Sequence, residues 1–243
     1  MNRYGLRLIG LLAVVAFFLT ACNLNIVRGS GDIVTEARNV SDFERVALSG
    51  SGELIIIQDG EESLTIETDD NVMQYIKSEV RGETLELGFD PVRTGSISPT
   101  RLTFTLHVND LRSLDIAGSG MVTAESIVTD RLDVEVSGSG NIEVDSLMAD
   151  VVETKISGSG EVNLSGEITK QAIEISGSGK YETQNLRCET AIVDVSGSGN
   201  ATVWVTDALE THISGSGSVS YYGSPKTDSS TSGSGTVRSL GEK

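Results

Sequence analysis

The chain has 243 residues, with 35 acidic against 18 basic residues and a formal net charge of −17. This charge argues against nucleic-acid binding, because phosphate backbones require a basic face, and against electrostatic docking on anionic lipid. Its two cysteines, Cys22 and Cys188, are too few for a disulfide framework or a metal cluster, so we expect no metal ion and no cofactor.

Residues 1–21 have the features of an export signal peptide. Two arginines precede an apolar run over residues 8–19, which is shorter than a membrane span. The tetrapeptide Leu-Thr-Ala-Cys at 19–22 then resembles the lipobox of bacterial lipoproteins, in which the chain is cut before the cysteine and the thiol carries diacylglycerol. We therefore predict that Cys22 is lipidated and holds the protein at a membrane of the bacterial cell envelope. The alternative is an ordinary secretory signal followed by a free Cys22.

Residues 22–31 form the predicted tether, and residues 32–117 form the predicted N-terminal β lobe. Apolar and polar residues alternate over 64–68, which is the pattern of a strand with one buried face. The residues at 69–71, Asp-Asp-Asn, commonly begin helices, and apolar side chains follow them at helical spacing. We therefore predict one short helix over residues 72–80.

The tripeptide Gly-Ser-Gly organises the rest of the chain. From Gly118 to Gly233 it recurs at intervals of 20, 20, 19, 20, 18 and 18 residues, and earlier copies begin at Gly29 and Gly50. A motif that returns at near-constant spacing indicates a repeat architecture. Each repeat contains two short alternating segments separated by a break, which predicts two strands with one buried face and a corner between them.

We interpret these repeats as coils of a parallel β-helix, because a ladder of hairpins would favour Asn-Gly or Asp-Gly turns. The predicted fold is thus all-β: a β-solenoid with two or more strands per coil over residues 118–238, ending in a C-terminal cap. Stacking lets neighbouring coils bury side chains that one coil cannot bury alone. The alternative role for the corner glycines is a nest of N–H groups that binds an anion. We predict that they form backbone corners, through a positive φ or close approach of the next coil: Gly118, Gly120, Gly138, Gly140, Gly158, Gly160, Gly177, Gly179, Gly197, Gly199, Gly215 and Gly217.

Three features together resemble a known bacterial family: the lipobox, the passage 65–72 that runs into the short helix, and the segment 111–115 ahead of serial Gly-Ser-Gly coils. The family is described as putative auto-transporter adhesin, head GIN domain, and the resemblance covers about residues 35–238. It implies a β-helical fold with right-handed coils, located on the cell surface or in the periplasm. The family brings no catalytic residues.

One column of outward-facing residues carries the candidate site. Aligning the repeats on the residue two before each closing Ser, or Ala117, gives Asp115, Glu135, Lys155, Glu174, Asp194, His212 and Ser230. Stacked coils would place these side chains about 5 Å apart, so facing carboxylates could recruit Ca²⁺ or a basic ligand. The predicted ligand or cation face therefore consists of Asp115, Glu135, Glu174 and Asp194. The alternative is a solvated face that keeps the rod soluble.

These features predict a lipid-anchored envelope protein that serves as a non-catalytic scaffold for adhesion or binding. Its expected partners are the membrane, through the lipid, and a surface glycan or a protein, but not nucleic acid. The alternative is a polysaccharide-active β-helix enzyme that uses the outward carboxylates as an acid/base pair and Trp204, Tyr221 and Tyr222 as a sugar platform. Corners this short cannot wall a cleft, and the sequence predicts no catalytic residue.

Overall fold

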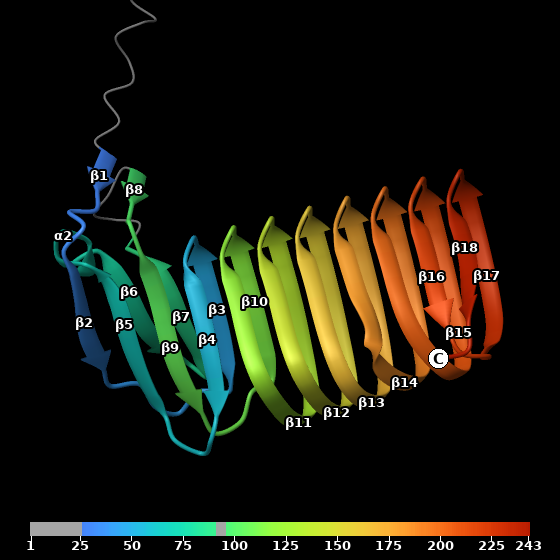
Figure 1. The fold of residues 1–243 in the computed structure, drawn as a ribbon, viewed down its shortest axis with the longest axis horizontal. Coiled ribbons are helices and arrows are strands. Elements are labelled where there is room, and N and C mark those ends of the chain that lie inside the picture. The colour runs from blue at the N-terminus through green and yellow to red at the C-terminus, as the bar shows by residue number, and fades with distance from the viewer. Residues whose placement is uncertain (1–25, 91–95) are drawn as a thin grey trace, which may run out of the picture.

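The structure, a computed structural model, describes residues 26–90 and 96–243 as one rod of stacked β-coils (Figure 1). The export signal and Cys22 lie outside the described residues. Five long strands form the regular coils: β11 (Met121–Gly138), β12 (Asn141–Gly158), β13 (Glu161–Gly177), β14 (Lys180–Gly197) and β15 (Asn200–Gly215). Each pairs in parallel with the next, as in the register from Met121 opposite Asn141 to Gly138 opposite Gly158. The predicted all-β solenoid is confirmed.

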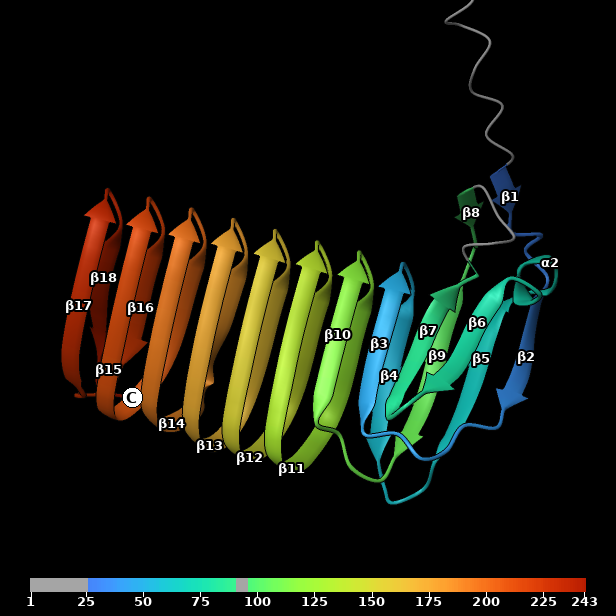
Figure 2. The same ribbon diagram turned by 180° about the vertical axis from the view of Figure 1, so that it is seen from behind.

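Both predicted strand segments of each coil are present, but backbone pairing continues around the bend between them, so each regular coil is one continuous strand. The two halves of a coil belong to opposite walls of the rod, which lie side by side along its length in both Figure 1 and the reverse view in Figure 2. The core between the walls is a single cluster of buried, mostly aliphatic side chains that runs from Val40 to Val219. The rod therefore has two outer faces, one on each wall.

We name the walls by their order along each coil. The first wall contains the first halves of the coils together with β2 (Ile33–Arg38), β5 (Ser63–Asp69), β9 (Leu102–Val108), β4 (Glu53–Gln58), β16 (Ser218–Tyr222) and β18 (Thr236–Gly241). The second wall contains the second halves together with β6 (Ile76–Arg81), β7 (Thr84–Phe89), β3 (Arg45–Gly50), β10 (Ser113–Gly118) and β17 (Lys226–Gly233).

Regular stacking begins earlier than residue 118. Strand β3 pairs in parallel with β10, placing Gly50 beside Gly118, and β4 pairs in parallel with the start of β11. The long interval between the second and third Gly-Ser-Gly copies is therefore an insertion within the stack. Its strands extend both walls toward the N-terminal end, where β2, β5 and β6 pair in antiparallel fashion with their neighbours.

The helix predicted over residues 72–80 is wrong in its extent. Helix α2 covers only Asp70–Met73, and residues 76–81 form strand β6. The side chains of Ile76, Ser78 and Val80 also fit a strand period, and β6 pairs with β7 across a tight turn, which places Val80 opposite Leu85. Pairing with an existing wall supplies hydrogen bonds and burial that an isolated turn of helix lacks, so tertiary context decides the outcome.

Asp69 precedes α2, but its side chain makes no capping hydrogen bond. The residue is fully buried, and its carboxylate accepts hydrogen bonds from the backbone N–H of Gly31 (2.8 Å), the backbone N–H of Thr100 (2.8 Å) and the Thr100 hydroxyl (2.5 Å). These donors, the Thr100 hydroxyl first, lower the pKa of Asp69 to about 2. Asp69 thereby joins the segments that follow β1 (Ile26–Arg28) and β8 (Ser96–Ser98), which pair in parallel.

We expect Asp69→Asn to lower the melting temperature at neutral pH, because an amide cannot accept all three hydrogen bonds. The folded-state pKa, about 2, lies below the ordinary 3.8. The carboxylate therefore contributes stability above pH 3.8, and this contribution is lost as the pH falls through about 2. Melting curves of both proteins across this range should converge at the acid end. A constant gap between the two melting temperatures would contradict this account.

The C-terminal end of the rod is closed with polar side chains. In β17 the inward positions are Thr227, Ser229 and Thr231, in register with buried residues of β15, and every residue of β17 is exposed. On the second wall, an outer strand without apolar side chains offers little for a further strand to bury.

Candidate binding face on the second wall

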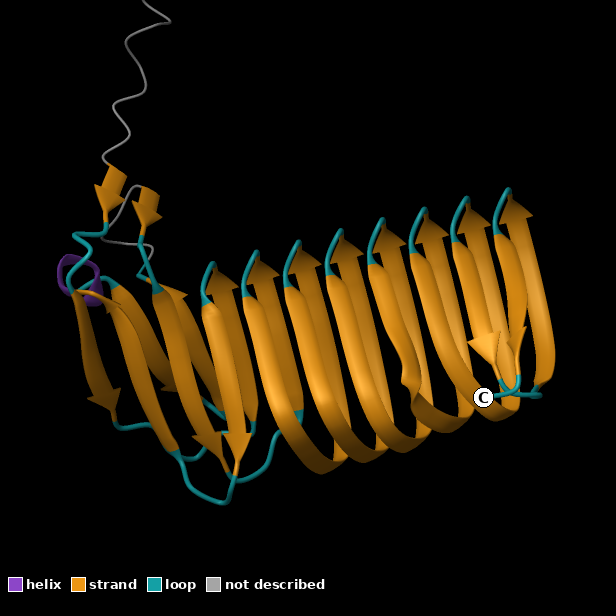
Figure 3. Ribbon diagram, viewed as in Figure 1, coloured by secondary structure: helices purple, strands orange, loops and turns teal. Residues whose placement is uncertain are grey.

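The glycine corners form one edge of the rod, where short loops join the end of each strand to the next (Figure 3). Gly138 has φ +124°, and a Cβ there would lie 2.6 Å from the carbonyl oxygen of Gly118. A Cβ on Gly140 would lie 2.5 Å from Cγ2 of Ile116. The N–H of Ser139 donates to Gly118 O (2.8 Å), so this donor is used by the neighbouring coil and is not free for an anion.

The pairing register places the aligned column in one row across the second wall. Asp115 lies beside Glu135, and the row continues through Lys155, Glu174, Asp194, His212 and Ser230. A second row, two residues earlier, contains Ser113, Asp133, Glu153, Ala172, Ile192, Glu210 and Asp228. We call these two rows the acidic band. That the band binds a ligand or a cation stays a prediction.

Carboxylates are crowded at the N-terminal end of the acidic band. Burial, and after it the charge of Glu135, raise the pKa of Asp115 above its ordinary value. Arg131 bridges two acids of the second row, with its Nη2 2.9 Å from Asp133 and 2.7 Å from Glu153. One guanidinium therefore offsets part of the repulsion within the band.

The acidic band lines a shallow groove along the rod. One hollow of about 290 Å³ is lined by Ser113, Asp115, Asp133, Val134, Glu135, Glu153 and Lys155. The next hollow shares Glu153 and Lys155 with it and also touches Asp194, which borders a third hollow toward β17. The groove has no wall of long loops, so it suits contact with an extended surface better than enclosure of a small molecule.

The sequence-based set of four carboxylates missed two groove residues, Asp133 and Glu153, and the Arg131 side chain that bridges them. The signal for the two acids was their position two residues before Glu135 and Lys155, which places them on the same outer face. Arg131 lies outside both rows, and its role depends on the reach of its side chain. Of the residues that the structure describes, no three His, Cys, Asp or Glu side chains converge to hold a metal ion.

The aromatic residues considered as a sugar platform do not share a face with the acidic band. Trp204 and Tyr222 are paired in register on the first wall, while Tyr221 packs against the core. The ammonium group of Lys243 lies 5.2 Å from the centroid of the Trp204 ring and 5.5 Å from that of Tyr222. Both rings therefore contact the Lys243 ammonium group of the same chain, and they lie on the wall opposite the acidic band.

Neither Cys188 nor His107 is placed to act as a nucleophile in the groove. Cys188 is buried, burial raises the pKa of its thiol to about 11, and Gln171 donates a hydrogen bond to its sulfur (3.0 Å). His107 contacts Asp59 (Nδ1 to Oδ2, 2.7 Å) on the first wall, again away from the acidic band. Neither of these two side chains therefore supplies the groove with an activated nucleophile.

The family model described as putative auto-transporter adhesin, head GIN domain, matches residues 42–225, which is most of the chain. The chain belongs to this family. The match spans the N-terminal insertion as well as the regular coils, so the head GIN domain includes both. No curated protein matches the sequence. Within the described ranges, no helix is long and apolar enough to cross a membrane.

Solved structures share the architecture of this head GIN domain. A putative adhesin from Bacteroides fragilis is 26% identical with a TM-score of 0.82, covering 88% of this chain and 100% of its own. A protein from Parabacteroides distasonis named putative lipid binding protein is 23% identical with a TM-score of 0.74, covering 89% and 100%. A putative adhesin from Parabacteroides merdae is 22% identical with a TM-score of 0.70, covering 88% and 99%. The last two likenesses establish the fold alone.

Proposed function

We propose that this chain is a lipid-anchored envelope protein that serves as a non-catalytic adhesion scaffold and binds its partner along the acidic band. The family's description as an adhesin and the lipobox at residues 19–22 support the location and the class of function. The observation that carries the binding face is the register of the coils. Parallel pairing repeats outward carboxylates at about 4.8 Å along a groove that no loop obstructs.

Charge indicates the chemistry of the partner. Among the residues of the acidic band, Lys155 is the one lysine and His212 the one histidine. The band contains eight acidic residues: Asp115, Asp133, Glu135, Glu153, Glu174, Asp194, Glu210 and Asp228. Such a face attracts basic side chains and suppresses contact with other acidic surfaces. The partner that fits this face is a protein surface rich in lysine and arginine.

A charge-reversal experiment tests this function. The double variant Glu135→Lys/Asp194→Lys should bind immobilised basic proteins roughly tenfold more weakly than the unmodified chain, because two exposed attractive contacts become repulsive. The matched control is Glu143→Lys/Glu182→Lys, which makes the same change in charge on the outer face of the first wall and should retain binding. Equal losses for both variants would contradict the band as the binding face. Selective retention on a glycan array instead would make the partner a glycan.

The second candidate is a polysaccharide-cleaving enzyme, favoured by one observation: Asp115, with its raised pKa, lies beside Glu135 in the same hollow. A glycosidase needs such a pair of unequal carboxylates. An open groove gives little exclusion of water and little hold on a sugar ring, so we favour binding. Release of reducing ends from polysaccharides that Glu135→Ala abolishes would replace the adhesion proposal.

A further inference from the structure

The strand pair β1–β8 projects from the N-terminal end of the rod on the side that carries the Gly-Ser-Gly corners (Figures 1 and 3). Hydrogen bonds hold the base of this pair. Asn71 Nδ2 donates to the carbonyl oxygen of Arg28 (2.8 Å), and Gly29 N donates to that of Ser98 (3.0 Å). Ile26 lies at the other end of β1. Strand β1 therefore begins on the corner side of the rod.

The distance from the predicted lipidation site to this projection is short. Only residues 23–25 separate Cys22 from Ile26. Four residue steps span at most about 14 Å when the chain is fully extended. A lipid on Cys22 would therefore keep the bilayer surface near the outer end of β1, on the side of the rod that carries the corners.

We call this side the serine edge. It consists of the eight stacked Gly-Ser-Gly corners, whose central serines are all exposed: Ser51, Ser119, Ser139, Ser159, Ser178, Ser198, Ser216 and Ser234. From Ser119 to Ser234, the backbone N–H of each central serine donates to a glycine carbonyl of the preceding coil. The tripeptides contain no charged residue. The edge therefore offers hydroxyl groups in an otherwise neutral row.

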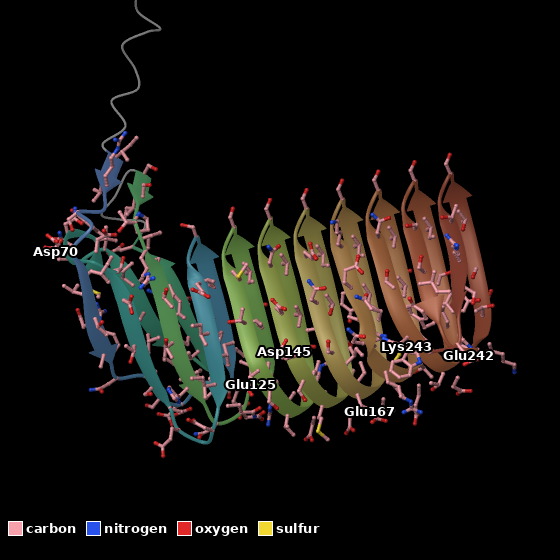
Figure 4. The ribbon with its side chains drawn as sticks, in the orientation of Figure 1. Asp70, Glu125, Asp145, Glu167, Glu242 and Lys243 are labelled. Atoms are coloured by element: carbon pink, nitrogen blue, oxygen red, sulfur yellow. The ribbon has the colours of Figure 1, made fainter. Side chains whose placement is uncertain are left out.

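The opposite edge, where each coil bends between its two halves, is charged. Figure 4 shows Glu125, Asp145 and Glu167 there, on three successive coils. Carboxylates are repelled by the negative surface of anionic bilayers, and the whole chain carries a net charge of −17. The Gly-Ser-Gly tripeptides themselves bring no carboxylate to a headgroup layer, whereas the charged edge brings one from each of these three coils.

We propose that the anchored chain lies along the bilayer with its serine edge against the headgroup layer and its charged edge directed away. This inference rests on the proposed lipidation of Cys22. Both walls then stand upright from the surface, and the acidic band faces sideways, open to a partner. The repeated Gly-Ser-Gly tripeptide thus serves stacking on its inner side and membrane approach on its outer side.

Site-specific fluorescence quenching tests this orientation with the full lipidated chain. Single reporters are attached to Ser139→Cys and Ser216→Cys on the serine edge and to Ser146→Cys on the charged edge, where Ser146 is also exposed. The buried Cys188, whose thiol has a pKa of about 11, should not compete for the label. Vesicles of phosphatidylcholine and phosphatidylglycerol, which have an anionic surface, carry spin-labelled headgroups as the quencher. We expect several-fold stronger quenching at positions 139 and 216 than at position 146.

Flotation of the same vesicles separates this inference from the anchor on which it depends. If the chain floats with the vesicles and Cys22→Ala does not, the anchor stands. Equal quenching at all three positions, or stronger quenching at position 146, then overturns the orientation alone. If the unmodified chain does not float, the proposed lipid anchor is wrong. The proposed orientation, which depends on that anchor, is then wrong as well.

Discussion

Gly138→Ala should destabilise the stack of coils by about 2–6 kcal/mol, although it adds only a single methyl group. Two costs combine. The backbone at Gly138 has φ +124°, which L side chains rarely adopt, and the new Cβ would lie 2.6 Å from the carbonyl oxygen of Gly118. The strain costs about 1–3 kcal/mol, and relieving the overlap costs about 1–3 kcal/mol more, because the neighbouring coil must move.

Gly82→Ala is the matched control. Gly82 also has a positive φ, +63°, but nothing lies within 4 Å of a Cβ built there. It should therefore show only the backbone cost, about 1–2 kcal/mol. Urea denaturation followed by circular dichroism measures both variants. A Gly138→Ala protein no less stable than Gly82→Ala would show that close approach between stacked corners does not constrain the coils.

The second large effect is expected in the core, at the hydrogen bond between Tyr181 and Gln171. Tyr181 lies on the first wall and donates from its hydroxyl to Gln171 Oε1 (2.9 Å) on the second wall. Both side chains are buried. Gln171→Leu removes this acceptor from a buried hydroxyl and should lower the free energy of unfolding by about 1–3 kcal/mol.

A double-mutant cycle isolates this interaction. In Gln171→Leu/Tyr181→Phe the orphaned hydroxyl is also removed, so the double variant should be more stable than Gln171→Leu alone. The core loses its polar pair but keeps similar side-chain volumes. Additive losses in the two single variants would mean that the Tyr181–Gln171 hydrogen bond contributes nothing measurable.

The repeat made the register predictable. Because one tripeptide recurs once per coil, aligning its copies also aligned Asp115 with Glu135 and Glu174 with Asp194, and the backbone pairs these residues. In a fold that lacks a repeat, neighbouring strands cannot be placed in register from the sequence alone. In this chain, an error of one residue in the alignment would have placed the whole column of outward residues, from Asp115 to Ser230, in the core.

The features that were not predicted depend on contacts between distant residues. Ile76 and Val80 suit both a helix and a strand, and only the pairing of β6 with β7 decides between them. Gln171 occupies an inward position, and its partner Tyr181 lies on the opposite wall, ten residues away. Arg131 is linked to the groove only through its side chain, which forms ion pairs with carboxylates on two coils. Periodicity identifies which face a residue occupies, but not which neighbours its side chain reaches.

Retention of vesicles that carry the lipidated chain, on surfaces coated with basic protein, tests the adhesion proposal most directly. Vesicles with the unmodified chain should be retained, and so should those with Glu143→Lys/Glu182→Lys. Glu135→Lys/Asp194→Lys should strongly reduce retention, because it replaces two exposed carboxylates of the acidic band with ammonium groups. Retention that does not differ between the unmodified chain and the double variant would show that this rod does not adhere through its second wall.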